Sequence, residues 1–176
     1  MVKKLIVGLG NPGAEYDNTY HNVGRALLHV VAPELKAAGH DLVWKSHKDL
    51  FSYVTTGTLI LVEPRTFMND SGAAVREAVK KFGIAPEDIV VLHDESDLKI
   101  GTYKISVERN SAGHKGVQSI MDALHSKAFT RVRIGIRPAA ELKRQKAEAF
   151  VLKKIGKKDE ALLATLFDGI ARDLIS

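Results

Sequence analysis

The chain has 176 residues, a length that suits one domain whose hydrophobic core needs no covalent or metal staples. It contains no cysteine, which excludes a disulfide framework, a thiolate nucleophile and a zinc site built on cysteine. The formal net charge is +5, but residues 99 to 158 hold 15 Lys and Arg against 4 Asp and Glu, a local net of +11 that favours a polyanionic partner.

Strands and helices are predicted to interleave along the chain. Short runs of β-branched and aliphatic residues predict strands at Lys4 to Gly8, Leu50 to Thr55, Leu59 to Glu63, Ile89 to His93, Tyr103 to Val107 and Arg131 to Ile136. Apolar residues at helical spacing, together with capping signals, predict helices at Gly24 to Ala38, Ser71 to Phe82, Gly116 to Leu124 and Asp159 to Ile175. Pro33 is expected to kink the first helix or to end it early.

This order predicts an α/β sandwich over residues 1 to 176, a single domain with a twisted, largely parallel mixed sheet flanked by helices. The Thr56-Gly57 turn between two predicted strands adds an antiparallel hairpin, which makes the sheet mixed. No linker, repeat or low-complexity segment indicates a domain boundary.

The segment 5–24 joins the first strand to a turn rich in Gly, Asn and Pro and then reaches His21. Its glycines at 8, 10 and 13 match the fingerprint of dinucleotide sites, in which the backbone approaches a pyrophosphate at a helix N-terminus. The polar residues after the third glycine do not predict that helix. We therefore interpret the glycines as a turn that brings Asn11 and His21 to one crevice, and we keep a dinucleotide-binding enzyme as an alternative.

Polar side chains follow four of the predicted strands. In open α/β sheets, functional groups collect at the carboxyl ends of the strands. Each residue alone has an ordinary structural explanation, as a turn, a helix cap or a loop residue, but their joint placement predicts a site. The residues at these strand ends are Asn11, His21, Met68, Asn69, His93, Asp94, Glu95, Asp97, Asn110 and His114.

Four motifs in this order resemble those of the bacterial-type peptidyl-tRNA hydrolase family, and the resemblance covers roughly residues 4 to 152. Four ordered motifs are far more specific than one glycine pattern. The motifs are LIVGLGNPG with the downstream Tyr16, Thr19 and His21-Asn22-x-Gly24; Glu63-Pro-Arg-Thr-Phe-Met-Asn69-Asp-Ser-Gly72; His93-Asp94-Glu-Ser-Asp97-Leu-Lys-Ile-Gly101; and Ser111-Ala-Gly113-His114-Lys-Gly116.

The resemblance implies hydrolysis of the ester that joins a peptide to the 3′ ribose of tRNA. His21, whose unperturbed pKa lies near about 6.5, can accept a proton from water at neutral pH. Asp94 matches the family's carboxylate, which would orient the imidazole and stabilise the imidazolium. Asn11 and Asn69 offer amide donors and acceptors for the substrate carbonyl and the ribose. We expect His21, Asp94 and Asn11 to be catalytic.

The resemblance also implies contacts to both halves of the substrate. Met68 matches a position on the peptide side of the cleft, where a flexible thioether tolerates many side chains. Phosphate contacts do not read sequence, which suits an enzyme that accepts many tRNAs. We expect substrate contacts from Tyr16, Met68, Asn69, His114 and Lys115, and tRNA phosphate contacts from Lys104, Arg131, Arg133 and Lys143.

The sequence departs from the family pattern at several positions, including the run Glu108 to Ala112, Ser96 and Lys99. Lys115 stands where the family has an asparagine that helps to place water or substrate. A lysine has three donors and no acceptor, so it can bind a phosphate or stabilise developing negative charge but cannot accept a hydrogen bond. A nearby cation also lowers the pKa of an imidazole, so Lys115 can act on His21. Tyr20 stands where the family commonly has arginine, which removes one candidate phosphate contact.

Other functions stay open at this point. A weakly active or non-catalytic RNA-binding relative on the same fold is favoured by Lys115, whereas the intact His21 and Asp94 argue against it. A metallohydrolase would use His21, His93, His114 and Asp94, but no compact ligand spacing such as HExxH occurs. We expect no metal and no cofactor.

The N-terminus enters a short apolar strand rather than the apolar core of a signal peptide, and no apolar run approaches the roughly 18 residues of a membrane span. We therefore expect a soluble, cytoplasmic protein with no membrane contact. We further expect a monomer that binds peptidyl-tRNA and needs no obligate protein partner.

Overall fold

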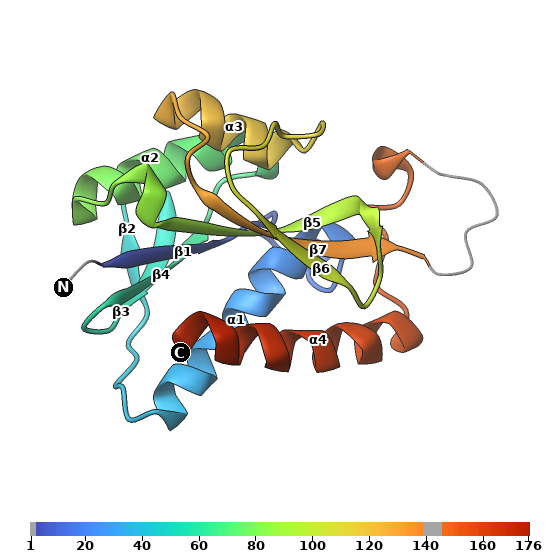
Figure 1. Cartoon of the computed structure of the whole chain (residues 1–176), viewed down its shortest axis with the longest axis horizontal. Helices are drawn as coiled ribbons and strands as arrows, with labels where there is room; N and C mark the ends of the chain where they lie inside the picture. The colour runs from blue at the N-terminus through green and yellow to red at the C-terminus, as the bar shows by residue number, and fades with distance from the viewer. Residues whose placement is uncertain (1–2, 139–145) are drawn as a thin grey trace.

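The computed structural model describes residues 3–138 and 146–176 and is built on one seven-stranded sheet with helices on both faces (Figure 1). The strands are β1 (Lys4–Gly8), β2 (Lys45–His47), β3 (Phe51–Thr55), β4 (Leu59–Pro64), β5 (Ile89–Lys99), β6 (Tyr103–Ser106) and β7 (Thr130–Arg137). The α-helices are α1 (Val23–Ala37), α2 (Ser71–Phe82), α3 (Lys115–Leu124) and α4 (Lys157–Ile175). Short 3₁₀ helices are η1 (Ala14–Tyr16), η2 (Tyr20–Asn22), η3 (Met68–Asp70), η4 (Pro86–Asp88) and η5 (Ala147–Ala149).

The strand order is β2-β3-β4-β1-β5-β7-β6. The four central strands, β4, β1, β5 and β7, run parallel to one another. Strands β3 and β2 at one edge and β6 at the other edge pair antiparallel. The predicted mixed, mostly parallel α/β sheet is therefore confirmed, and so is the antiparallel hairpin of β3 and β4. Among the described residues, no helix combines the length and apolar character needed to cross a membrane.

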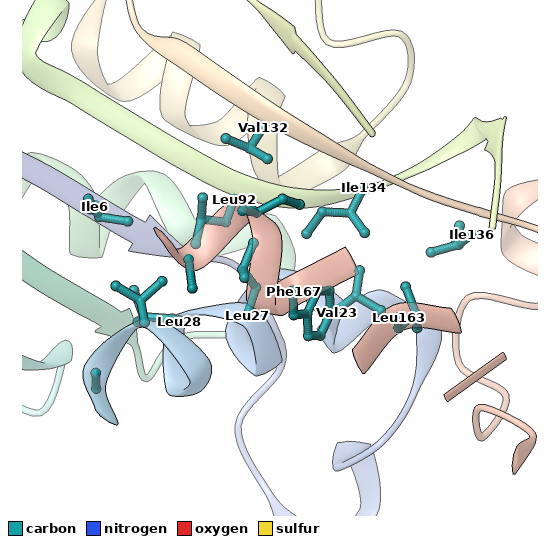
Figure 2. Close-up of a cluster of buried hydrophobic side chains, with 14 of the residues drawn as sticks. Ile6, Val23, Leu27, Leu28, Leu92, Val132, Ile134, Ile136, Leu163 and Phe167 are labelled. Atoms are coloured by element: carbon teal, nitrogen blue, oxygen red, sulfur yellow. The ribbon is translucent and has the colours of Figure 1, made fainter. Parts of the chain in front are cut away.

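Two hydrophobic cores lie on opposite faces of the sheet. Successive strand residues point to opposite faces, so Ile6 of β1 joins the core beneath α1 and α4, while Leu5 and Val7 join the core beneath α2 and α3. Figure 2 shows the first core, in which Leu27 of α1 and Phe167 of α4 pack toward the sheet. Burial on both faces explains why the central strands read as continuous apolar runs.

Three elements differ from the sequence prediction. Strand β5 runs to Lys99 rather than ending at His93, because residues 93–95 pair with residues 133–135 of β7. Strand β2 was not predicted: it has only three residues and gains its order by pairing with β3. Helix α1 continues past Pro33, whose neighbours Ala32 and Leu35 are buried, so tertiary packing holds the last turn together.

The segment between β1 and α1 folds as η1 and η2 rather than as an α-helix directly after the glycines, which argues against a dinucleotide site. The segment 146–152, which follows β7 in the chain, contacts the loop that carries His21. The His21 N–H donates to the Val151 carbonyl over 2.8 Å. The Tyr20 hydroxyl donates to Asp159 Oδ2 over 2.6 Å, and burial together with this bond raises the pKa of Tyr20 to about 12. Tyr20 therefore fastens the loop that carries His21 to α4.

Helix α1 can start beside β5 only because residue 24 is glycine. A Cβ at Gly24 would lie 2.1 Å from the carbonyl oxygen of Leu92, which is two residues before Asp94. Helix α1 begins one residue before Gly24 and His21 lies just ahead of it, so this close approach sets the distance between the His21 loop and β5.

Replacing Gly24 with alanine should lower the free energy of unfolding by about 1 to 3 kcal/mol, because the new methyl group meets backbone that cannot move aside. Urea denaturation measures this change. Gly169→Ala is the matched control: nothing lies within 4 Å of its Cβ position inside α4, so alanine should stabilise that helix slightly. Equal stability of the two variants would contradict the role given to Gly24.

Candidate active site

A cavity of about 920 Å³ opens at the carboxyl ends of the central strands. Its wall combines the turn after β1, η1, η2, η3, β5, the start of α3 and η5, which are far apart in the sequence. All eight residues expected to be catalytic or to contact substrate line it: Asn11, Tyr16, His21, Met68, Asn69, Asp94, His114 and Lys115. Residues from four predicted strand ends thus share one site.

Two histidines bind one buried carboxylate at the centre of this wall. His21 Nδ1 lies 3.0 Å from both oxygens of Asp94, and His114 Nε2 lies 2.8 Å from Asp94 Oδ1. Only 3% of the Asp94 side chain is exposed, against 15% for His21 and 10% for His114. The imidazole rings of His21 and His114 are 5.2 Å apart. Asp94 is a strand residue of β5, which gives the carboxylate a rigid base.

The hydrogen bonds define the roles of the ring nitrogens. His114 is the N-cap of α3, and its Nδ1 accepts the N–H of Val117 over 3.2 Å, so its proton lies on Nε2 and is donated to Asp94. His21 donates from Nδ1 to the same carboxylate, which leaves His21 Nε2 with no hydrogen bond to any described residue. The unprotonated Nε2 of a neutral His21 is therefore available to the cavity as a base.

Charges around the site hold Asp94 ionised and His21 basic. Burial raises the pKa of Asp94, but attraction and hydrogen bonds from His114 and His21 outweigh it, so that pKa lies far below its usual range. Burial lowers the pKa of His21, Asp94 raises it by charge and hydrogen bond, Lys115 lowers it, and the net shift is upward. The fully buried His93 packs edge-on against the His114 ring at 4.7 Å, and burial holds its pKa well below the usual value.

Asn11 is fixed so that it presents a donor. Its Oδ1 accepts the backbone N–H of Met68 over 2.8 Å, which assigns the amide oxygen and leaves Nδ2 for the cavity. The Asn11 backbone exchanges two hydrogen bonds with the Asn22 side chain, at 2.9 and 3.0 Å. Arg25 contacts the Asn11 carbonyl and pairs with the buried Glu63 at 2.7 Å. This network ties β1, α1 and β4 together behind the site.

The remaining wall offers aromatic and apolar surface. Tyr16 and Phe67 meet edge to face with ring centroids 6.0 Å apart. Met68 is 4% exposed, and Gly116 leaves room for its sulfur, because a Cβ there would lie 2.4 Å from Met68 Sδ. Asn69 is exposed in η3, just before α2, and borders the same cavity.

The three described residues expected to bind phosphate differ in exposure. Lys104 is exposed on the edge strand β6. Arg131 and Arg133 are buried, at 2% and 8% exposed, contrary to the picture of open phosphate contacts. Arg131 donates to the Asn110 carbonyl over 3.1 Å, and Arg133 pairs with Glu95 at 3.0 Å. Lys143 lies outside the described residues.

Sequence reasoning missed part of the site. The segment 146–152 contributes Lys146, Ala147, Glu148, Val151 and Leu152 to the cavity wall, although no motif points to them. Asn22 and Phe67 were quoted within motifs but were given no role. The adjacency of Asn22 to His21 and of Phe67 to Met68 was the signal that could have found them.

The side chains of His21, Asp94 and His114 also offer metal-ligand atoms, all within 4.8 Å of one another. Two histidines and a carboxylate form a donor set that divalent transition ions accept. The same three groups are joined by hydrogen bonds, which explains their closeness without an ion.

The chain is similar over most of its length to proteins of one known family. The sequence matches the family described as "Peptidyl-tRNA hydrolase" over residues 5–176. The chain belongs to the peptidyl-tRNA hydrolase family. It is 38% identical to the peptidyl-tRNA hydrolase of Lactobacillus gasseri over 169 residues, which cover 94% of this chain and 87% of the relative. The corresponding enzyme of Mycobacterium tuberculosis H37Rv is 38% identical over 173 residues, which cover 95% of this chain and 86% of the relative.

A solved structure agrees with this assignment. The crystal structure of the peptidyl-tRNA hydrolase from Acinetobacter baumannii superimposes with a TM-score of 0.83 at 30% identity, covering 97% of this chain and 85% of that chain. The family resemblance carried by the four motifs and the fold predicted from the order of strands and helices are therefore confirmed.

In nuclear magnetic resonance titrations, His21 should keep its proton to a higher pH than an ordinary histidine, because Asp94 raises its pKa above 6.5. The charge of protonated His21 then stabilises the folded state below the unfolded-state pKa, and this contribution is lost as pH rises through the folded-state value. In Asp94→Asn, burial and Lys115 remain and both lower the pKa of His21, so it should fall below 6.5. A wild-type His21 that titrates below 6.5 would contradict this geometry.

Proposed function

We propose that the chain hydrolyses the ester between the peptide and the 3′ ribose of peptidyl-tRNA. One observation carries the proposal: His21 is bound through Nδ1 to the buried Asp94, and its Nε2 has no hydrogen bond to any described residue in a cavity that Asn11 also lines. A base next to a fixed donor is what hydrolysis of a carbonyl ester requires. Family membership supplies the substrate class.

The reaction follows from the positions of these atoms. His21 Nε2 takes a proton from a water molecule as the water oxygen attacks the ester carbonyl, and the carbonyl electrons move onto its oxygen. Asp94 stabilises the imidazolium through the hydrogen bond to Nδ1. When the tetrahedral intermediate collapses, the bond to the ribose 3′ oxygen breaks and His21 Nε2 returns the proton to that oxygen.

Asn11 and His114 are positioned by the protein itself before substrate arrives. Asn11 Nδ2 donates to the carbonyl oxygen or to the ribose end, because its Oδ1 is already used by Met68. His114 donates to Asp94 and caps α3, so it acts as a positioning residue that holds the carboxylate in place. Asn69 supplies a second amide at the rim.

The peptide and tRNA halves of the substrate meet different surfaces. Met68, Tyr16 and Leu152 offer apolar walls of irregular shape, which suit peptides of many sequences. Lys104 is exposed on β6 and is placed to contact tRNA phosphate. Arg133 assists indirectly, because its pairing with Glu95 holds β7 against the end of β5.

One copy of the chain suffices for this chemistry, since every residue named above belongs to it. We accordingly propose a monomer that acts as one domain, without an obligate protein partner. We also propose that the protein acts in the cytoplasm, where tRNA is used.

Replacing His21 with alanine should lower the rate of peptidyl-tRNA hydrolysis by about 10²- to 10⁴-fold, because the base is lost. Single-turnover cleavage of a defined peptidyl-tRNA measures this, and filter binding should show tRNA affinity within a few-fold of wild type. His40→Ala is the matched control, since His40 is exposed after α1 and outside the cavity.

Three results of that experiment decide between the alternatives. If the wild-type protein binds peptidyl-tRNA but does not cleave it, the non-catalytic interpretation is correct. Full activity of His21→Ala would remove the general-base assignment. Loss of wild-type activity in a chelator, restored by a divalent ion, would favour a metal at His21, Asp94 and His114; we expect the rate to be unchanged.

Lys104→Ala should weaken substrate binding, whereas Arg133→Ala should lower the stability of the fold. Removing the exposed Lys104 should raise KM several-fold with kcat unchanged and should reduce the salt slope of binding by about 1. Removing Arg133 leaves the buried Glu95 without its partner and should lower the free energy of unfolding by about 3 kcal/mol. Steady-state kinetics at several salt concentrations and urea denaturation separate the two. A salt slope unchanged in Lys104→Ala would contradict its role.

A further inference from the structure

Two of the described lysines and arginines, Lys146 and Lys115, line the cavity, and Lys115 is the one that directly follows His114. It is the first residue of α3, between His114, which contacts Asp94, and Gly116, which packs against Met68. Its side chain is exposed and lines the same cavity as His21 and Asn11. The backbone at Lys115 is therefore held between His114 and Gly116, which both belong to the site.

Nothing in the described structure explains Lys115 as a stabilising residue. Its ammonium group forms no hydrogen bond or ion pair with any residue that the structure describes. A cation at the N-terminus of a helix also opposes the helix dipole, which favours negative charge there. A positive charge at the unfavourable end of the helix dipole, next to a cavity, points to a functional role for Lys115.

We propose that the Lys115 ammonium receives the negative charge that develops on the carbonyl oxygen of the ester during hydrolysis. This inference rests on the proposed function and adds a catalytic residue to it. When water adds to the carbonyl carbon, the carbon–oxygen π electrons move to the carbonyl oxygen, and Lys115 together with Asn11 Nδ2 stabilises that oxyanion. The electrons return when the bond to the 3′ oxygen breaks, so Lys115 keeps its proton throughout.

The position of Lys115 favours the carbonyl oxygen over a tRNA phosphate. Lys104, Arg131 and Arg133 belong to β6 and β7, and none of them lines the cavity. Lys115 lies instead beside the histidine pair, and its charge reaches the His21 ring, where it lowers the pKa of that imidazole. Lys115 lines the same cavity as the base that activates water, so its charge also acts on the ester carbonyl that this water attacks.

This arrangement also limits the effect of Asp94 on His21. Charged and titratable groups line the cavity with His21 from four elements: Tyr16 in η1, Asp94, Glu95 and Asp97 on β5, His114 and Lys115 at α3, and Lys146 and Glu148 next to and within η5. Asp94 raises the pKa of His21 and Lys115 opposes that rise, which keeps more of the free base at neutral pH. One side chain thus serves both the base and the oxyanion.

Lys115→Met, Lys115→Arg and Lys115→Asn test the proposal with purified full-length protein and a defined peptidyl-tRNA. Lys115→Met should lower kcat by about 100-fold with KM within about 3-fold of wild type, as expected for the loss of an oxyanion contact. The acid limb of its pH profile should move to higher pH. Lys115→Arg keeps the charge and should retain kcat within about 10-fold, with the acid limb unmoved.

Two controls separate a catalytic loss from a binding or folding loss. An uncleavable substrate with an amide in place of the ester should bind Lys115→Met within about 3-fold of wild type. Lys36→Met removes an exposed lysine from the last turn of α1, outside the cavity, and should leave both constants unchanged. The thermal unfolding midpoint of each variant confirms that it is folded.

Other outcomes overturn the proposal in distinguishable ways. A raised KM and weaker binding of the amide substrate at unchanged kcat would make Lys115 a phosphate contact. Wild-type kinetics in Lys115→Met would make it a solvated lysine. Full activity in Lys115→Asn but not in Lys115→Arg would show that the position supplies a neutral hydrogen bond rather than charge. Wild-type protein that fails to cleave would defeat the proposed function itself.

Discussion

Asp94 carries a negative charge while only 3% of its side chain meets solvent, and the rest of the site depends on how that charge is held. Burial of a carboxylate is unfavourable and would by itself raise its pKa, so an isolated Asp94 would become neutral. Hydrogen bonds from His21 and His114 reverse the direction. The carboxylate in turn fixes the tautomer of His21 and leaves its Nε2 free. The buried charge and the available base are therefore one arrangement.

The fold brings the three groups of this arrangement together from separate elements. Asp94 belongs to β5, which is held by β1 on one side and β7 on the other. His21 precedes α1, whose approach to β5 depends on the missing side chain of Gly24. His114 is fixed because its Nδ1 caps α3. Each of these contacts is already made in the folded chain without substrate, so the site requires little additional ordering when substrate binds.

The sequence predicted the sheet class and the contents of the cavity well, because both depend on local signals. Apolar runs and caps mark the central strands and helices, and polar residues at strand ends mark the site. The limits of β5 could not be read, since Asp94 and Glu95 are poor strand formers and stay in the strand only through pairing with β7. Segment 146–152 reaches the cavity through contacts distant in sequence, such as the bond from the His21 N–H to Val151, which no local pattern encodes.

The basic stretch shows why a charge count alone overstates phosphate binding. Of its lysines and arginines, Arg133 neutralises Glu95 inside the sheet, and the Lys154 ammonium donates to the carbonyls of Glu15 and Asp17, closing the loop that carries His21. Arg133 and Lys154 therefore donate their hydrogen bonds to groups within the protein. Lys104 is exposed on β6, and Lys115 projects from a fixed helix start into the cavity wall. A net of +11 therefore does not measure the number of open phosphate contacts, because part of this charge serves internal pairing and loop closure, and burial and hydrogen-bond partners show which residues these are.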